Sequence, residues 1–190
     1  MILAMVRHGQ THYNARGLVQ GRINIPLTDA GREQAKALGK MLKEEGETFD
    51  RVAASPLSRA LETAYLISKQ LKMNQPIYVD HQFVERDFYH LDGTPLETAM
   101  PLVRIKNYKH EHYEHDELIM RRILKAVRKL YLEFPNEKIL LVAHSHVIKA
   151  ILMNIDSEKY SFADLIRHLD VIYFEVTDKE IKVINRKGLS

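Results

Sequence analysis

Arginine, histidine and glutamate side chains occur together in four short segments of the sequence. In chain order these segments are Arg7-His8-Gly9, residues 55–59 with Arg59, Glu85-Arg86 and His144-Ser145-His146. A phosphoryl group presents several oxygens, to which guanidinium and imidazole groups donate strong hydrogen bonds. If the fold brings the four segments together, they form a pocket for a phosphorylated ligand.

Taken alone, each segment has an ordinary explanation. Arg59 on a helix is usually a solvated surface cation, and Glu85 beside Arg86 is usually a surface ion pair. His144 after a buried strand is about as often a hydrogen-bonded core histidine as a ligand-binding one. The joint placement of these residues in the predicted fold is what favours the functional interpretation.

Three of the four segments directly follow a predicted strand. Residues 2–6 and 138–143 are continuous apolar runs, as in strands buried on both faces, and residues 51–54 form a shorter run. Ligands of open α/β sheets bind beyond the carboxyl ends of the strands. We therefore expect the basic groups to meet at one edge of the sheet, beside helix N-termini that favour bound anions.

Segments with helical periodicity alternate with these strands. Thr28 or Asp29 is expected to cap the first helix, which ends before Gly46, and Ser55 is expected to cap the second, with Pro56 at its first turn. The other predicted elements are helices over residues 119–134 and 148–155, an extended segment at 77–79, an irregular stretch from about 80 to 115, and a hairpin of 171–176 and 181–184.

This alternation predicts an α/β fold with a single domain over residues 1–190. The expected architecture is a three-layer sandwich, in which helices cover both faces of a mostly parallel mixed sheet. The terminal hairpin supplies the antiparallel part of the sheet. Residues 86–115 are expected to form a lid-like insert.

Composition excludes several classes of protein. The 190 residues include no cysteine, which excludes disulfides, thiolate metal ligands and a cysteine nucleophile. The net charge of +3 is small and the basic residues are dispersed, so no nucleic-acid partner is expected. No apolar run approaches the ~20 residues of a membrane span, and the apolar start stops at Arg7 without the features of a signal peptide. We therefore expect a cytoplasmic protein without a membrane partner.

The segments are parts of longer sequence blocks. These blocks are Val6 to Thr11 followed by Asn14, Gly21-Arg22 and Pro26-Leu27-Thr28; Ser55 to Ala64; Glu85 to Phe88; and Leu140 to His144. Together they resemble the motifs of the histidine phosphatase superfamily, also called phosphoglycerate-mutase-like. The resemblance runs from residue 2 to about residue 155, and the combination of blocks is highly specific.

The resemblance implies a role for each matching residue. His8 would be the nucleophile that is phosphorylated during turnover, and Glu85 would be the proton donor. Arg7, Arg59 and His144 would hold the phosphoryl oxygens. Residues assigned to substrate binding are Asn14, Gln20, Gly21, Arg86 and Ser145, and no metal or cofactor is expected.

Physical chemistry sets two requirements for these roles. His8 must be neutral to attack, so its other ring nitrogen should donate to an acceptor such as a backbone carbonyl, while nearby arginines lower its pKa. Glu85 can donate a proton near neutral pH only if it is partly desolvated or receives help from the phosphate dianion.

The chain also departs from the family pattern. Ser145 stands where a glycine usually follows the second histidine, and His146 after it is unusual. Tyr89-His90 follows Phe88 where glycine is usual, and Asp92-Gly93 replaces a common Glu-Gly pair. These departures affect the expected substrate fit and rate more than the reaction type.

The short segment between Glu85 and His144, and the pair Gln10-Thr11, resemble the phosphatases of the family more than the mutases. We therefore expect hydrolysis of a small phosphorylated metabolite, with residues 86–115 deciding which one. The alternatives are a phosphoglycerate mutase-type phosphoryl transfer and a catalytically silent phosphate-binding regulatory domain.

Two further features leave alternatives open. The spacing of His110, His112 and His115 is compatible with a transition metal, although a polar lid over the pocket is the favoured interpretation. The exposed edge of the C-terminal hairpin could pair between subunits, which would make the protein a homodimer.

Overall fold

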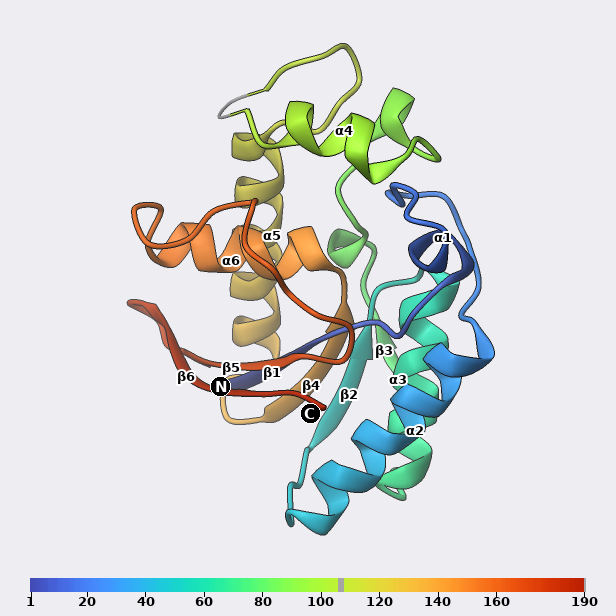
Figure 1. Ribbon diagram of the computed structural model, residues 1–190. Coiled ribbons are helices and arrows are strands. Elements are labelled where there is room, and N and C mark those ends of the chain that lie inside the picture. The colour runs from blue at the N-terminus through green and yellow to red at the C-terminus, as the bar shows by residue number, and fades with distance from the viewer. Residues whose placement is uncertain (106–107, 190) are drawn as a thin grey trace.

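A six-stranded mixed sheet lies at the centre of the computed structural model, which describes residues 1–105 and 108–189 (Figure 1). Its strands are β1 (Ile2–Arg7), β2 (Arg51–Ala54), β3 (Tyr78–Val79), β4 (Lys138–Ala143), β5 (Val171–Val176) and β6 (Ile181–Lys187). The spatial order is β3-β2-β4-β1-β5-β6. Strands β1 to β4 are parallel, and β5 and β6 run antiparallel to their neighbours. The predicted mixed, mostly parallel sheet is therefore confirmed.

Strand β1 contributes to a hydrophobic core on each face of the sheet. Leu3 and Met5 are buried on one face, and Ala4 and Val6 on the other, because successive side chains of a strand point in opposite directions. The covering helices are α2 (Asp29–Glu44) and α3 (Ser58–Gln70) on one face, and α5 (Asp116–Glu133) and α6 (Ser145–Ile155) on the other (Figure 1). The predicted three-layer arrangement is confirmed.

The two predicted helix starts differ in outcome. Thr28 caps α2, since its hydroxyl accepts a hydrogen bond from the backbone N–H of Gly31 at 3.0 Å. The prediction that Ser55 caps the next helix is wrong: Leu57 is the N-cap of α3 and makes no side-chain cap bond. The Ser55 hydroxyl instead contacts the ring of His144.

The stretch predicted to be irregular contains a helix, α4 (Leu96–Val103), and two short 3-10 turns, at His81–Phe83 and Tyr89–Leu91. A further short helix that we did not predict, α1 (His12–Ala15), follows β1. Pro95 is the N-cap of α4 and Pro101 lies inside it. Burial of Ala99 and Val103 holds this helix in a small separate core, with Val19, Phe88, Leu91 and Tyr113.

None of the helices within the described ranges is both long and apolar enough to cross a membrane.

Candidate active site

The register of β1 and β4 brings two histidines together at one edge of the sheet. Arg7 pairs with Ala143 at the ends of the two parallel strands, so His8 and His144 leave the sheet at the same level. Their ring centroids lie 5.2 Å apart, and both residues are buried. The predicted convergence at the carboxyl ends of the strands is thus present for these two side chains.

Backbone contacts orient His8. Its Nδ1 lies 2.8 Å from the carbonyl oxygen of Gly9, so Nδ1–H donates there. Its Nε2 has no hydrogen-bond partner among the described residues. Burial is the largest cause that lowers the pKa of His8 well below its ordinary value, and repulsion from Arg59 is the second largest. The ring is therefore neutral, with the lone pair of Nε2 available.

Two glycines let the His8 loop lie directly on the first turn of α2. A Cβ atom on Gly31 would lie 2.1 Å from the carbonyl oxygen of Gln10, and one on Gly9 would lie 2.6 Å from the carbonyl oxygen of Gly31. The loop also receives a contact from α3, because the N–H of Gly9 donates to the hydroxyl of Thr63 at 3.1 Å. The backbone around His8 is thereby held from two sides.

His144 is fully buried, and its Nε2 lies 2.7 Å from the hydroxyl oxygen of Ser55. Its Nδ1 is buried and has no partner among the described residues. The pKa of His144 also lies well below its ordinary value, mainly because of burial and secondly because of repulsion from Arg59. The ring therefore has one nitrogen held by the protein and one buried nitrogen without a partner in the described chain.

Two arginines surround these rings. Arg59 is fully buried and donates to the carbonyl oxygens of Gly21 at 2.7 Å and Ile23 at 2.9 Å. Arg7 donates to the carbonyl oxygen of Ile166 at 2.6 Å. Burial lowers the pKa of each guanidinium to about 10, so both stay charged at neutral pH. Because their protein acceptors are neutral carbonyls, the two positive charges remain available to an anion.

Glu85 is buried, and backbone N–H groups hold its carboxyl group. The N–H of Arg86 donates to Oε1 at 2.8 Å, and that of His146 donates to Oε2 at 3.4 Å. Burial raises the pKa of Glu85, although these bonds and the charge of Arg59 oppose the shift. This matches the desolvation that a proton donor requires near neutral pH.

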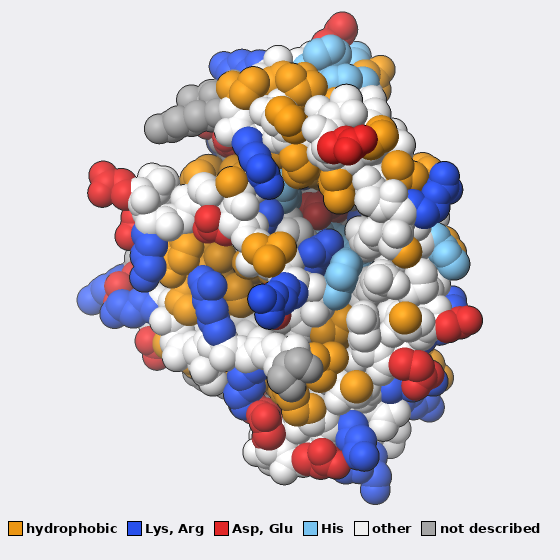
Figure 2. Space-filling view, in the orientation of Figure 1, with side chains coloured by type: hydrophobic (Ala, Val, Ile, Leu, Met, Phe, Trp, Pro, Cys, Tyr) orange, Lys and Arg blue, Asp and Glu red, His pale blue; other side chains and the backbone are white. Residues whose placement is uncertain are grey.

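Arg7 and Glu85 also line a pocket of about 330 Å³, together with three other predicted site residues, Asn14, Gln20 and Ser145. His8, Arg59 and His144 are not among the residues that line it. Figure 2 shows charged and histidine side chains together with apolar ones around a hollow below α4. The apolar part of its wall includes Leu18, Phe88, Leu96, Met100, Phe162 and Ile166. The lining of the pocket is thus partly charged and partly apolar.

Two predicted substrate-binding residues lie outside the pocket lining. Gly21 donates its N–H to Asp92 and accepts from Arg59, so it supports the arginine. The fully buried guanidinium of Arg86 donates to Tyr113 at 2.7 Å and to Asp116 at 2.9 Å, and it stacks on a nearby phenylalanine ring. The structure therefore places both behind the pocket wall.

Three residues near the site were not assigned a role from the sequence. The ring of His168 lies 5.6 Å from that of His8, and its Nδ1 lies 2.9 Å from the carbonyl oxygen of His8. Lys149 lines the pocket and is nearly buried. His146, noted above only as unusual, lines it too, and its Nδ1 is buried without a partner in the described chain. The sequence around His168 contains no motif that could have identified it. Lys149 could have been identified, because it lies one turn after Ser145 on a predicted helix.

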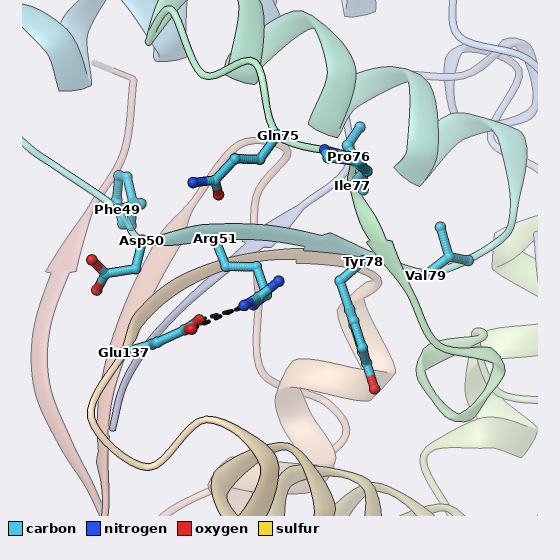
Figure 3. Close-up of a pocket in the computed structure, with 9 residues that line it drawn as sticks. All are labelled: Phe49, Asp50, Arg51, Gln75, Pro76, Ile77, Tyr78, Val79 and Glu137. Atoms are coloured by element: carbon cyan, nitrogen blue, oxygen red, sulfur yellow. Dashed lines mark hydrogen bonds and ion pairs between the residues drawn. The ribbon is translucent and has the colours of Figure 1, made fainter.

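A second, more open cavity of about 780 Å³ lies at the amino ends of the parallel strands β2, β3 and β4 (Figure 3). Arg51 and Glu137, at the starts of β2 and β4, form a bidentate ion pair there, with two hydrogen bonds from the guanidinium to the carboxylate. None of the predicted site residues lines this cavity. Within residues 1–105 and 108–189, no three His, Cys, Asp or Glu side chains are arranged to hold a metal ion.

The fold is thus an α/β fold with two histidines and two arginines gathered at the carboxyl ends of its parallel strands. The family model of the histidine phosphatase superfamily (branch 1) matches residues 3–184. The chain therefore belongs to this superfamily.

Relatives include both phosphatases and mutases. The chain is 35% identical over 156 residues to an uncharacterized phosphatase PhoE from Bacillus subtilis, covering 80% of this chain and 76% of the relative. It is 27% identical to a 2,3-bisphosphoglycerate-dependent phosphoglycerate mutase from Parvibaculum lavamentivorans, covering 94% and 91%. A phosphoglycerate mutase structure from Bacillus anthracis shares the fold, with a TM-score of 0.87 and 23% identity over 100% of this chain and 92% of the other. The chain is thus a phosphatase or mutase of this superfamily.

Proposed function

We propose that the protein hydrolyses a small phosphomonoester through a phosphohistidine formed at His8. The observation that carries the proposal is the environment of this ring. Its Nδ1 is bound to the Gly9 carbonyl, which leaves Nε2 free, and the cations Arg7 and Arg59 lie close enough to repel its protonated form. A nucleophile held neutral beside two fixed positive charges suits attack on a phosphoryl group.

In the first step, Nε2 of His8 attacks phosphorus and the bond from phosphorus to the ester oxygen breaks. Arg7 and Arg59 stabilise the charge on the transferring oxygens, as cations do in other phosphoryl-transfer enzymes. His144 donates a further hydrogen bond through its unoccupied Nδ1. The protonated Glu85 gives its proton to the leaving oxygen, which departs as a neutral alcohol.

In the second step, water attacks the phosphohistidine. Glu85, now a carboxylate, accepts a proton from this water, while the bond between phosphorus and Nε2 breaks. Phosphate and neutral His8 are released, and Glu85 is protonated again. Two easier displacements thus replace one difficult displacement.

The remaining predicted residues divide into two groups by position. Asn14, Gln20 and Ser145 line the pocket and are proposed to contact the substrate. Gly21 and Arg86 lie behind it and are proposed to hold Arg59 and the pocket wall in place. The segment that carries α4, whose residues Leu96 and Met100 line the pocket, is proposed to act as the lid.

Hydrolysis is favoured over mutase activity by the short segment between Glu85 and His144 and by the similarity to a protein described as a phosphatase. Mutase activity is the second candidate, because a mutase matches nearly the whole chain. A cytoplasmic location and a homodimer formed through the hairpin edge stay predictions from the sequence.

The test compares the wild type with His8→Ala on phenyl phosphate and a panel of phosphorylated metabolites, in excess chelator. His12→Ala serves as the control, because His12 is exposed on the neighbouring α1. We expect phosphate release by the wild type and the control but not by His8→Ala. Alkaline mass spectrometry of the quenched enzyme should locate phosphate on His8.

Two results would contradict the proposal. Interconversion of phosphoglycerates that requires a bisphosphoglycerate primer, without comparable phosphate release, would identify a mutase. Absence of both turnover and phosphohistidine would indicate a silent phosphate-binding domain.

A further inference from the structure

The side chain of Lys149 is a positive charge in the pocket that the proposed mechanism does not use. Lys149 lies on α6, one turn after Ser145, and both side chains line the pocket. Residues four apart lie on the same face of a helix. Lys149 is only 8% exposed, which is rare for a lysine without a charged partner.

The protein satisfies only part of this ammonium group. Nζ donates one hydrogen bond, to the carbonyl oxygen of Phe162 at 2.9 Å. No carboxylate lies within ion-pair distance of Nζ in the described ranges. An ammonium carries three N–H donors, so two donors are left for a ligand.

The nearest acidic groups, Glu85 and Asp164, offset only part of the effect of burial, which lowers the pKa of Lys149 to about 8. Asp164 uses both of its carboxylate oxygens at 3.0 Å to cap the turn at Ser161. Glu85 is held by two backbone N–H groups, and burial raises its pKa. A buried charge without a paired counterion is costly, so Lys149 favours a negative group at this point of the pocket.

The position of Lys149 relative to the phosphoryl site decides which part of a substrate it meets. Arg7 and Glu85 line the same pocket, with Arg7 assigned to the phosphoryl oxygens and Glu85 to the leaving oxygen. Lys149 belongs to neither set, and the surrounding wall includes the apolar Phe88, Met100 and Phe162. A leaving alcohol that fills this part of the pocket would therefore bring its body to Lys149.

We propose that Lys149 is a specificity-determining residue that binds a carboxylate on the leaving group of the substrate. The proposal rests on the proposed phosphatase function. The two free donors of Nζ match the two oxygens of one carboxylate, and the single buried charge matches its single charge. A second phosphoryl group would carry more charge than this one cation offsets. Arg104, the other pocket cation outside the phosphoryl site, is exposed.

The test uses two nearly isosteric substrates: carboxyphenyl phosphate and carbamoylphenyl phosphate, each as the ortho, meta and para isomer. The variants are Lys149→Met, which keeps the apolar stem, and Lys149→Arg, which keeps the charge. Lys125→Met is the matched control, because Lys125 is exposed on α5.

We expect the wild type to prefer the best carboxyphenyl isomer through a lower KM. Lys149→Met should raise that KM about 10- to 100-fold, the effect of losing a charged hydrogen bond. It should leave kcat, and the KM for the carbamoyl analogue, within about threefold of wild type. Lys149→Arg should restore much of the preference, and Lys125→Met should change nothing.

A binding measurement separates this proposal from the proposed function. Kd values for both ligands are measured by calorimetry in the His8→Ala background, with and without Lys149→Met, where turnover plays no part. Loss of the carboxylate preference in the double variant supports the role of Lys149 even if the wild type hydrolyses neither compound. Equal losses for both ligands, or a preference that disappears with Arg104→Met instead, would overturn it.

Discussion

The Nε2 atom of His144 lies 2.7 Å from the hydroxyl oxygen of Ser55, across 89 positions of sequence. The contact joins the carboxyl ends of β4 and β2. If the Ser55 hydroxyl donates to Nε2, the proton of the neutral ring must lie on Nδ1. That nitrogen has no partner among the described residues, so with this bond direction Ser55 would select the tautomer that can donate to a phosphoryl oxygen.

Replacing Ser55 by alanine is therefore expected to lower kcat about tenfold, the effect of one lost hydrogen bond, because both tautomers of His144 become accessible. Steady-state kinetics test this, and nitrogen NMR of the labelled histidine reports the tautomer. Ser68→Ala is the control, since Ser68 is also a buried serine on the adjacent helix α3. Equal activity in wild type and Ser55→Ala would contradict the tautomer argument.

Glu85→Gln is expected to lower kcat by about 100-fold or more, the usual contribution of a general acid. The loss should be smaller for aryl phosphates whose phenols are more acidic, because such leaving groups need less protonation. A series of substituted phenyl phosphates measures this dependence. A loss independent of the leaving group would remove Glu85 from the role of proton donor.

The same substitution is expected to stabilise the protein at neutral pH. Burial raises the pKa of Glu85 in the folded state above its ordinary value of 4.5. Between pH 4.5 and this higher pKa, the folded state therefore binds more protons than the unfolded state. The wild type then loses stability as the pH rises through that window. Urea unfolding at pH 4 and pH 7 should show Glu85→Gln gaining stability over wild type only at the higher pH.

Mild acid is expected to unfold the protein. Four histidines have pKa values below the ordinary 6.5, and burial is the largest cause for each: His8, His144, His146 and His168. Below pH 6.5 the unfolded state therefore takes up protons that the folded state does not, and each such histidine contributes a slope of about 1.4 kcal/mol per pH unit. His146→Phe should reduce the slope of the free energy of unfolding against pH by about 1.4 kcal/mol per pH unit. His81→Phe, at an exposed position, should leave this slope unchanged.

Tyr113→Phe tests whether Arg86 supports the pocket wall. The tyrosine hydroxyl accepts a hydrogen bond from Arg86 at 2.7 Å inside the protein, and its loss leaves a buried donor unpaired. We expect the free energy of unfolding to fall by about 1–3 kcal/mol, with kcat changed less than twofold. A large fall in kcat at unchanged stability would instead place Arg86 in contact with the substrate.

The sequence was sufficient to predict the sheet and the meeting of His8 and His144 at the ends of its strands. Continuous apolar runs such as residues 138–143 are typical of strands buried on both faces, and the structure confirms this strand with the same bounds. His8 and His144 follow such strands directly, so the parallel register alone brings them together.

Contacts between distant segments account for what was missed. Nothing local to Ser55 shows that its hydroxyl serves a histidine instead of capping a helix. The partners of Arg86 and Lys149 lie on segments far away in the sequence. Helix α4 was missed because Gly93 and Pro101 are typical helix breakers, whereas burial of its apolar face against the insert core outweighs that tendency.

The position of β1 in the sheet has a consequence for biosynthesis. This strand comes first in the chain, yet its two neighbours, β4 and β5, end at Ala143 and Val176. On the ribosome, the apolar β1 must therefore wait unpaired until most of the chain has been translated, and long-range pairing of this kind slows folding. His8, the proposed nucleophile, emerges early but acquires its surroundings late, so incomplete chains contain His8 without the residues that surround it in the folded protein.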